Sequence, residues 1–285
     1  MLSRRCLGRM FLLRPSNLAN QLFRFILAVA AQRYGIQVHC FCVLSNHFHL
    51  VVTDPMGNSP AFMRDLCGLV ARSFNAMHGR WETFWAPASY SSVVLLTPAD
   101  VLDKMAYTLA NPAEADLVRR GQEWPGLWTD PAAIGGAPLF TERPKHFFRE
   151  EGPMPESAVL QLVSPPGFSS IEEVRSQLEE RLAALQEQAE GSRQRAGRAC
   201  LGVRRVLAQH PHGRPVSGAP RRGLNPRIAS RDKWKRIEAI GRLREFLRSY
   251  RQAWTAFVRG VRDTLFPIGT YWMRVAYRAP CAAPD

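Results

Sequence analysis

The spacing of apolar residues in the first half of the chain predicts short strands alternating with helices. Helical spacing over residues 17–34 and 59–78 predicts two helices, the first with Ser16 as its N-cap. A third helix is expected to begin after Thr97 and to end at Pro112. Alternating or β-branched residues predict strands over residues 4–13, 36–43, 47–53 and 89–96.

The predicted order is therefore β-α-β-β-α-β, followed by the third helix. The first six elements match a ferredoxin-like split βαβ unit. We expect an α+β fold in which helices cover one face of a ferredoxin-like antiparallel sheet. The other face would stay open for a functional site, with the third helix packed at that face or at its edge.

The middle of the chain has a different composition. Residues 121–166 are rich in Pro and Gly and predict mostly loop. A capping box, formed by Ser170 and the glutamate three positions later, predicts the start of a helix. Residues 209–223 combine Pro, Gly and Arg and predict a linker.

A long, basic, amphipathic helix is expected over residues 231–259. Its aromatic residues lie on the apolar stripe, which favours a position in the core over contact with nucleic acid. A short strand is expected over residues 271–277. We therefore divide the chain into an N-terminal domain, residues 1–130, and a mainly α-helical accessory region, residues 131–285.

Two histidines open the third predicted strand. Because successive side chains of a strand point to opposite faces, His47 and His49 share one face, and the other face holds Phe48, Leu50 and Val52. The apolar set predicts contact with a core. The two imidazoles would stand about 7 Å apart along the strand, near enough to share one metal ion. Taken alone, this spacing more often belongs to ordinary strand residues.

The third predicted helix supplies a possible third ligand and a nucleophile. Tyr107 and Asn111 are four residues apart and project from one helical face, away from the apolar stripe. If that face meets the open side of the sheet, the Asn111 side-chain oxygen can join His47 and His49 on a metal. Two imidazoles and an amide oxygen favour Mg²⁺ or Mn²⁺ over a closed zinc site. Tyr107 would be a nucleophile for a phosphodiester.

Composition favours a polyanionic partner. The net charge is +14 and the pI is about 10.3, while 46% of the residues are hydrophobic, as in a globular protein. Candidate DNA contacts are Arg64, Arg72 and Arg80, although a solvated helix face is the simpler interpretation. Six scattered cysteines without a Cys-x-x-Cys pair predict reduced thiols and a cytoplasmic protein. No apolar run reaches the roughly 18 residues of a membrane span, so no membrane partner is expected.

Three blocks of sequence occur in a characteristic order: residues 39–52 with Asn-His-Phe-His, residues 89–91 (Ser-Tyr-Ser) and residues 107–112 (Tyr-x-x-x-Asn-Pro). A Glu-Trp-Pro follows at residues 123–125. Together they resemble the REP-associated tyrosine transposases of the single-tyrosine HUH superfamily. The resemblance covers about residues 4–130, and the joint presence of the blocks is more specific than the His-x-His alone.

The resemblance implies a ferredoxin-like fold and an enzyme that cleaves and rejoins single-stranded DNA near hairpins. His47 and His49 would bind Mg²⁺ or Mn²⁺, with Asn111 in the third ligand position. Tyr107 would attack the scissile phosphate, leaving a 5′-phosphotyrosine and a free 3′-OH. Attack by a 3′-OH on that phosphotyrosine would then give strand transfer.

The residues after Pro112 depart from the family pattern. Where the family usually has Val-Arg-Ala-Gly, this chain has Glu114 in place of the arginine and Asp116 at the last position. This puts a phosphate contact in question, so a DNA-binding protein that keeps the fold but has lost catalysis is a second hypothesis. A metallohydrolase acting on a non-nucleic substrate is a third. The sequence leaves monomer and homodimer open.

Overall fold

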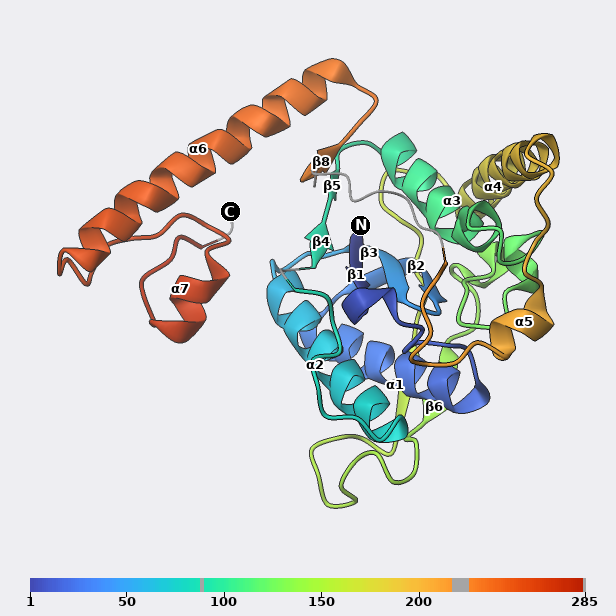
Figure 1. Cartoon of the computed structure of the whole chain (residues 1–285). Coiled ribbons are helices and arrows are strands. Elements are labelled where there is room, and N and C mark those ends of the chain that lie inside the picture. Colours follow the sequence, from blue (N-terminus) through green and yellow to red (C-terminus); the bar gives the residue numbers. More distant parts are fainter. Residues whose placement is uncertain (88–89, 217–225, 284–285) are drawn as a thin grey trace.

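A four-stranded antiparallel sheet lies at the centre of the computed structural model, which describes residues 1–87, 90–216 and 226–283 (Figure 1). The spatial order of the strands is β2-β3-β1-β4. The strands are β1 (Leu2–Arg5), β2 (Gln37–Leu44), β3 (His47–Thr53) and β4 (Ser91–Ser92). The predicted α+β class is confirmed. The chain order, β1-α1-β2-β3-α2-β4, is the one expected for a split βαβ unit.

One face of the sheet is covered by α1 (Asn17–Tyr34) and α2 (Ser59–Met77), which also contact each other. The Ser16 side chain accepts a hydrogen bond from the backbone N–H of Ala19 at 3.1 Å, as an N-cap does. In the main core beneath these helices, the rings of Phe23 and Phe48 meet edge to face at 5.4 Å. This is the core contact that the alternation along β3 predicts.

The opposite face of the sheet carries α3 (Pro98–Glu114), and α4 (Ile171–Arg195) packs against α3 (Figure 1). The face expected to be open is therefore covered by the third predicted helix. A register shift in β2 between Val38 and Cys40 helps to make this contact. It turns Cys40 toward α3, whereas Val38 and Phe41 point into the main core.

Several element boundaries differ from prediction. The opening strand ends at Arg5 and is followed by a short 3-10 helix (Leu7–Arg9). The strand expected over residues 89–96 is split into β4 and β5 (Val94–Leu95), and residue 89 lies outside the described part of the chain. Pro112 does not end α3, which continues to Glu114 because a proline in the last turn removes a single helical hydrogen bond.

The middle of the chain packs onto the sheet domain. Its Pro/Gly-rich stretch contains an antiparallel pair, β6 (Leu139–Glu142) and β7 (Ser157–Leu160), which lies against α1. Leu160 joins the main core, and Leu178 of α4 joins the core beneath α3. Shared cores therefore cross the boundary expected at residue 130. The linker expected over residues 209–223 lies partly outside the described part of the chain.

The C-terminal part contains β8 (Ile228–Ala229), α6 (Lys233–Val258) and α7 (Tyr271–Ala276). β8 pairs in parallel with β5, and α6 then extends away from the sheet domain (Figure 1). The strand expected over residues 271–277 is wrong, because α7 occupies that stretch. The core position expected for the α6 aromatics is wrong at the start of the helix, where Trp234 is 76% exposed, and is confirmed near its end, where Phe257 is buried. Among the described helices, none has both the length and the apolarity needed to cross a membrane.

Candidate active site

β3 places the two histidines side by side on the α3 face of the sheet. In the antiparallel register, His47 lies opposite Arg5 of β1, and His49 lies opposite Ser3. The imidazole ring centroids are 5.0 Å apart, and the ring planes are almost perpendicular at 88°. His49 is buried and His47 is partly buried. The predicted sharing of one face is therefore confirmed.

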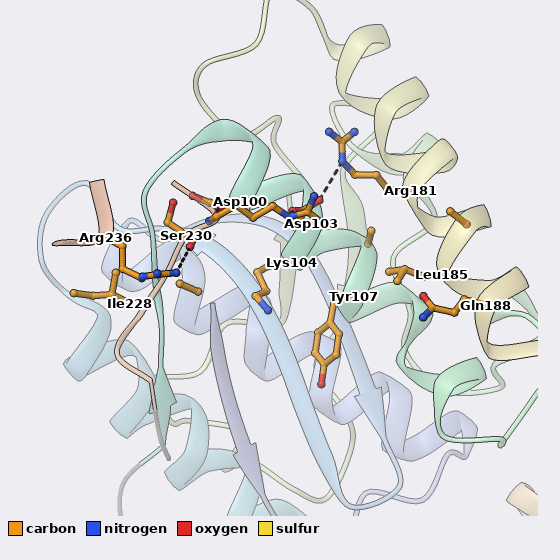
Figure 2. A pocket seen from close by; sticks show the side chains of 14 residues that line it. Asp100, Asp103, Lys104, Tyr107, Arg181, Leu185, Gln188, Ile228, Ser230 and Arg236 are labelled. Atoms are coloured by element: carbon orange, nitrogen blue, oxygen red, sulfur yellow. Dashed lines mark hydrogen bonds and ion pairs between the residues drawn. The ribbon is translucent and has the colours of Figure 1, made fainter. Parts of the chain in front are cut away.

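α3 brings Tyr107 and Asn111 to the same place. The Tyr107 ring centroid lies 5.8 Å from that of His49, and Asn111 makes a side-chain hydrogen bond with His47. Figure 2 shows Tyr107 pointing from α3 toward the strands of the sheet. The structure thus unites the four residues that the sequence selected as nucleophile and ligands.

Two contacts fix the position of α3. A capping box between Thr97 and Asp100 begins the helix, as the Thr-Pro pair in the sequence predicts. Near its other end, the indole N–H of Trp128 donates a 2.9 Å hydrogen bond to the Leu109 carbonyl. Because α3 packs against the sheet on one side and against α4 on another, its position is fixed. The position of Tyr107 on this helix is therefore fixed as well.

Burial keeps both imidazoles neutral near pH 7. Burial, together with the nearby charges of Arg5 and Lys104, lowers the pKa of His49 to about 4. Burial likewise holds the pKa of His47 well below its usual range, with His49 and Arg5 adding to the effect and the hydrogen bond with Asn111 opposing it. A neutral imidazole has the lone pair that a metal ligand needs.

The donor set at this site fits a divalent metal ion. His49 Nδ1 is buried and has no hydrogen-bond partner among the described residues, which is costly for a polar atom unless a ligand meets it. His47 Nδ1 lies 2.6 Å from Asn46 Oδ1, and this contact fixes the orientation of the ring, as a hydrogen bond to the second nitrogen of a metal-binding histidine does. With the Asn111 amide oxygen, the two imidazoles make three donors of the type that Mn²⁺ and Mg²⁺ accept.

Carboxylates and thiolates do not supply a further ligand here. In the described part of the chain, no three His, Cys, Asp or Glu side chains are grouped so that they could hold a metal. His39, the next histidine in sequence, uses both ring nitrogens in contacts with the Val163 carbonyl at 2.9 Å and Thr53 Oγ1 at 2.8 Å. It is a buried structural residue.

Two cationic residues that the sequence analysis did not select border the site. The Lys104 ammonium lies 5.2 Å from the Tyr107 ring centroid, over the ring. Arg5 reaches the site across the β1–β3 pairing and is electrostatically coupled to Tyr107. Lys104 was detectable, because it precedes Tyr107 by three residues on the same helix. Arg5 was not, because strand register cannot be read from the local pattern.

The three arginines predicted to contact DNA lie elsewhere. Arg64 and Arg72 are on α2, on the sheet face opposite the histidines, and Arg80 follows that helix. Arg64 pairs with Asp65 at 2.9 Å and donates to the Tyr271 hydroxyl at 3.0 Å. The structure does not bring these arginines to the site, and their contact with DNA stays a prediction.

The two acidic residues that depart from the family pattern have separate environments. Asp116 forms ion pairs with Arg193 and Arg198, and so ties the end of α3 to the end of α4. Glu114 lies on the same helical face as Asn111, and desolvation raises the pKa of its carboxyl. Asp116 therefore has a structural use, whereas Glu114 leaves an acidic group near the site.

Comparisons of the chain with protein-family models, curated proteins and solved structures found no match. The grounds for a functional assignment are therefore the sequence motifs and the geometry of this site. That geometry combines a tyrosine hydroxyl, two neutral imidazoles, an amide and two cations within one small region.

Proposed function

We propose that this protein is a metal-dependent enzyme that cleaves and rejoins single-stranded DNA through a covalent phosphotyrosine, as single-tyrosine HUH transposases do. The observation that carries the proposal is the convergence of Tyr107 with His47 and His49. A tyrosine on a helix flank or a histidine pair on a strand is common. A possible nucleophile beside metal donors and cations is the arrangement that phosphoryl transfer needs.

The chemistry would begin at the Tyr107 hydroxyl. Its oxygen would attack phosphorus and release its proton to water, and the bond from phosphorus to the DNA 3′-oxygen would break. That oxygen would take a proton and leave as a 3′-OH, while the 5′-phosphate stays on Tyr107. Lys104 and Arg5 would stabilise the negative charge that develops on the phenolic oxygen and the phosphate.

The phosphotyrosine would allow rejoining without an external energy source. Attack by a 3′-OH on this phosphate would break its bond to Tyr107 and restore a DNA phosphodiester and the free hydroxyl. His47, His49 and Asn111 would hold Mg²⁺ or Mn²⁺. When bound, that ion supplies Lewis-acid neutralisation of the nonbridging phosphate oxygens. The net charge of +14 supports a nucleic-acid substrate.

The test is transfer of a DNA label to the protein. A library of hairpins with single-stranded flanks, labelled at the 3′ end, is incubated with the full chain and Mn²⁺ or Mg²⁺. The label is then followed on a denaturing gel, because the proposed reaction leaves the 3′ fragment on Tyr107. We expect an adduct with the parent chain, none with Tyr107→Phe and none in EDTA.

Tyr90→Phe is the matched control, because Tyr90 packs against the main core away from the histidines. It should keep the adduct while losing one phenolic hydroxyl elsewhere. An adduct that persists in Tyr107→Phe would refute the assigned nucleophile. If the parent chain binds the hairpins in a salt-dependent manner but gives no adduct with either metal, the protein is a DNA-binding protein without catalysis.

A further inference from the structure

A cavity of about 590 Å³ lies beside Tyr107, and neither His47 nor His49 lines it (Figure 2). Three separate parts of the chain form it: α3, α4 and the segment that runs from β8 into α6. Figure 2 shows Lys104 and Tyr107 projecting from α3, Gln188 from α4, and Ser230 and Arg236 from the C-terminal segment. Two of the three walls therefore come from outside the part of the chain that resembles the transposases.

The carboxylates of this cavity are already engaged. Asp103 pairs with Arg181 at 3.3 Å and with Arg231 at 2.8 Å. Asp100 caps α3 and also accepts a 3.0 Å hydrogen bond from the Arg231 backbone N–H. The acidic groups therefore hold the walls together. They do not make the cavity a site for a cation.

Two cations remain available to a ligand. The Lys104 ammonium lies over the Tyr107 ring, and Arg236 donates to the Ser230 carbonyl at 3.1 Å. In the part of the chain that the structure describes, neither forms an ion pair with a carboxylate. Arg236 is exposed, so its remaining N–H groups can reach an anion.

The rest of the lining is apolar or neutral. Aliphatic side chains from all three walls present a hydrocarbon surface, and they are Ala106, Ala184, Leu185 and Ile228. Gln188 adds an amide that can both donate and accept hydrogen bonds. The apolar surface can contact a base, the amide can form hydrogen bonds with the polar edge of that base, and the two cations can contact a phosphate. The volume is in the range of small-ligand pockets, about 300–1,000 Å³.

We propose that this cavity binds one nucleotide of the single strand that flanks the phosphodiester at Tyr107. Lys104 and Arg236 contact its phosphate, and the base lies against the aliphatic wall near Gln188. The inference rests on the proposed function for its substrate class, because Tyr107 borders both the cavity and the histidine site. It adds a role for the C-terminal segment, which completes the subsite.

The experiment measures binding without chemistry. The full chain is titrated against a short fluorescein-labelled oligothymidylate in EDTA, at several salt concentrations. Arg236→Gln should weaken binding about threefold to fivefold. It should also reduce the slope of log affinity against log salt by about 0.7, the contribution of one phosphate contact on a single strand. Arg236→Lys keeps the charge and should keep the slope.

A second variant tests the base position. Ala184 is exposed on α4, so Ala184→Trp fills the cavity without disturbing the core. We expect about a tenfold loss of affinity, the equivalent of one lost base contact, with an unchanged salt slope. Arg242→Gln is the matched control. Arg242 is an exposed arginine of α6, paired with Glu238 and outside the cavity, and its loss should have less effect on affinity than the loss of Arg236.

The outcomes separate this inference from the proposed function. If Arg236→Gln and Ala184→Trp bind like Arg242→Gln, the subsite is wrong even where the Tyr107 adduct forms. If both variants weaken binding while no adduct forms on any hairpin, the subsite stands and the catalytic proposal fails. If thymidine monophosphate binds as tightly as the oligothymidylate and both variants weaken it equally, the cavity is a mononucleotide site, which overturns its assignment to a strand.

Discussion

Two amphipathic helices of this protein, α3 and α6, differ in the burial of their apolar faces. The apolar stripe of α3 is fully buried between the sheet and α4, as at Leu102 and Leu109. The apolar stripe of α6 remains largely outside a core, with Trp234 76% and Ile237 50% exposed. Periodicity predicts the face of a helix, but the partner of that face is set by the rest of the fold.

The difference bears directly on function. Since the apolar side of α3 is fixed, its polar side holds Tyr107 and Asn111 in a defined position over the histidines. Only the C-terminal end of α6 lies in a core, around Phe257 and Phe266. The charged side chains of α6 face solvent. Chemistry that needs fixed geometry is expected at α3, whereas α6 can contribute charge.

The largest expected effect is on the free energy of unfolding, when one side chain of each apolar stripe is truncated and the two losses are compared. Leu109→Ala removes a fully buried side chain and should cost about 2–5 kcal/mol of unfolding free energy. Leu247→Ala, at a partly exposed position of α6, should cost less than about 1 kcal/mol. Urea unfolding followed by circular dichroism measures both. Equal losses would mean that α6 has a buried partner in solution.

A pH effect of similar size should arise at His49. Its pKa in the folded protein, about 4, is below the ordinary value of 6.5, so only the unfolded chain takes up this proton between those values. Stability from this group is complete above pH 6.5 and is lost as the pH falls toward 4, by on the order of 3 kcal/mol. His49→Gln should flatten the unfolding free energy across this window in metal-free buffer. An unchanged pH profile would contradict the burial of this imidazole.

A smaller effect is expected at Lys104. Lys104→Met keeps the length of the side chain but removes the charge over Tyr107, and should slow adduct formation by about tenfold, or 1.4 kcal/mol in the barrier. Lys104→Arg should retain most of the rate. The measurement is the initial rate of label transfer at saturating DNA. A rate equal to that of the parent chain would remove Lys104 from the mechanism.

The smallest effect should come from the basic surface of α6. Arg248 is exposed, and among the described residues its ion pair is with Glu245, three residues earlier on the same helix. Arg248→Gln should change stability by less than about 0.5 kcal/mol. It should lower the salt dependence of single-strand binding by no more than about 0.7 in slope. A larger loss of binding would extend the DNA contact along α6 beyond Arg236.

The features that sequence reveals here are those with a local cause. The two faces of β3 follow from alternation at His47 and Phe48, and the start of α3 follows from the Thr97 cap. The pairing of Tyr107 with Asn111 follows from helical spacing.

Other features depend on distant partners and were not predictable. The register shift near Cys40, the approach of Arg5 and the β6–β7 pair arise from contacts between residues far apart in the chain. The cavity beside Tyr107 also depends on the packing of the segment around Arg236 near α3. Local sequence patterns contain no information on such tertiary contacts.

The most direct measurement is the position of Mn²⁺ in crystals of the full chain, located by anomalous scattering. We predict a peak in contact with the imidazoles of His47 and His49 and with the Asn111 side-chain oxygen, next to the Tyr107 hydroxyl. His49→Gln should remove or greatly weaken that peak. Saturating Mn²⁺ that binds elsewhere, or a Tyr107 side chain turned away from the histidines, would contradict the single site formed by β3 and α3.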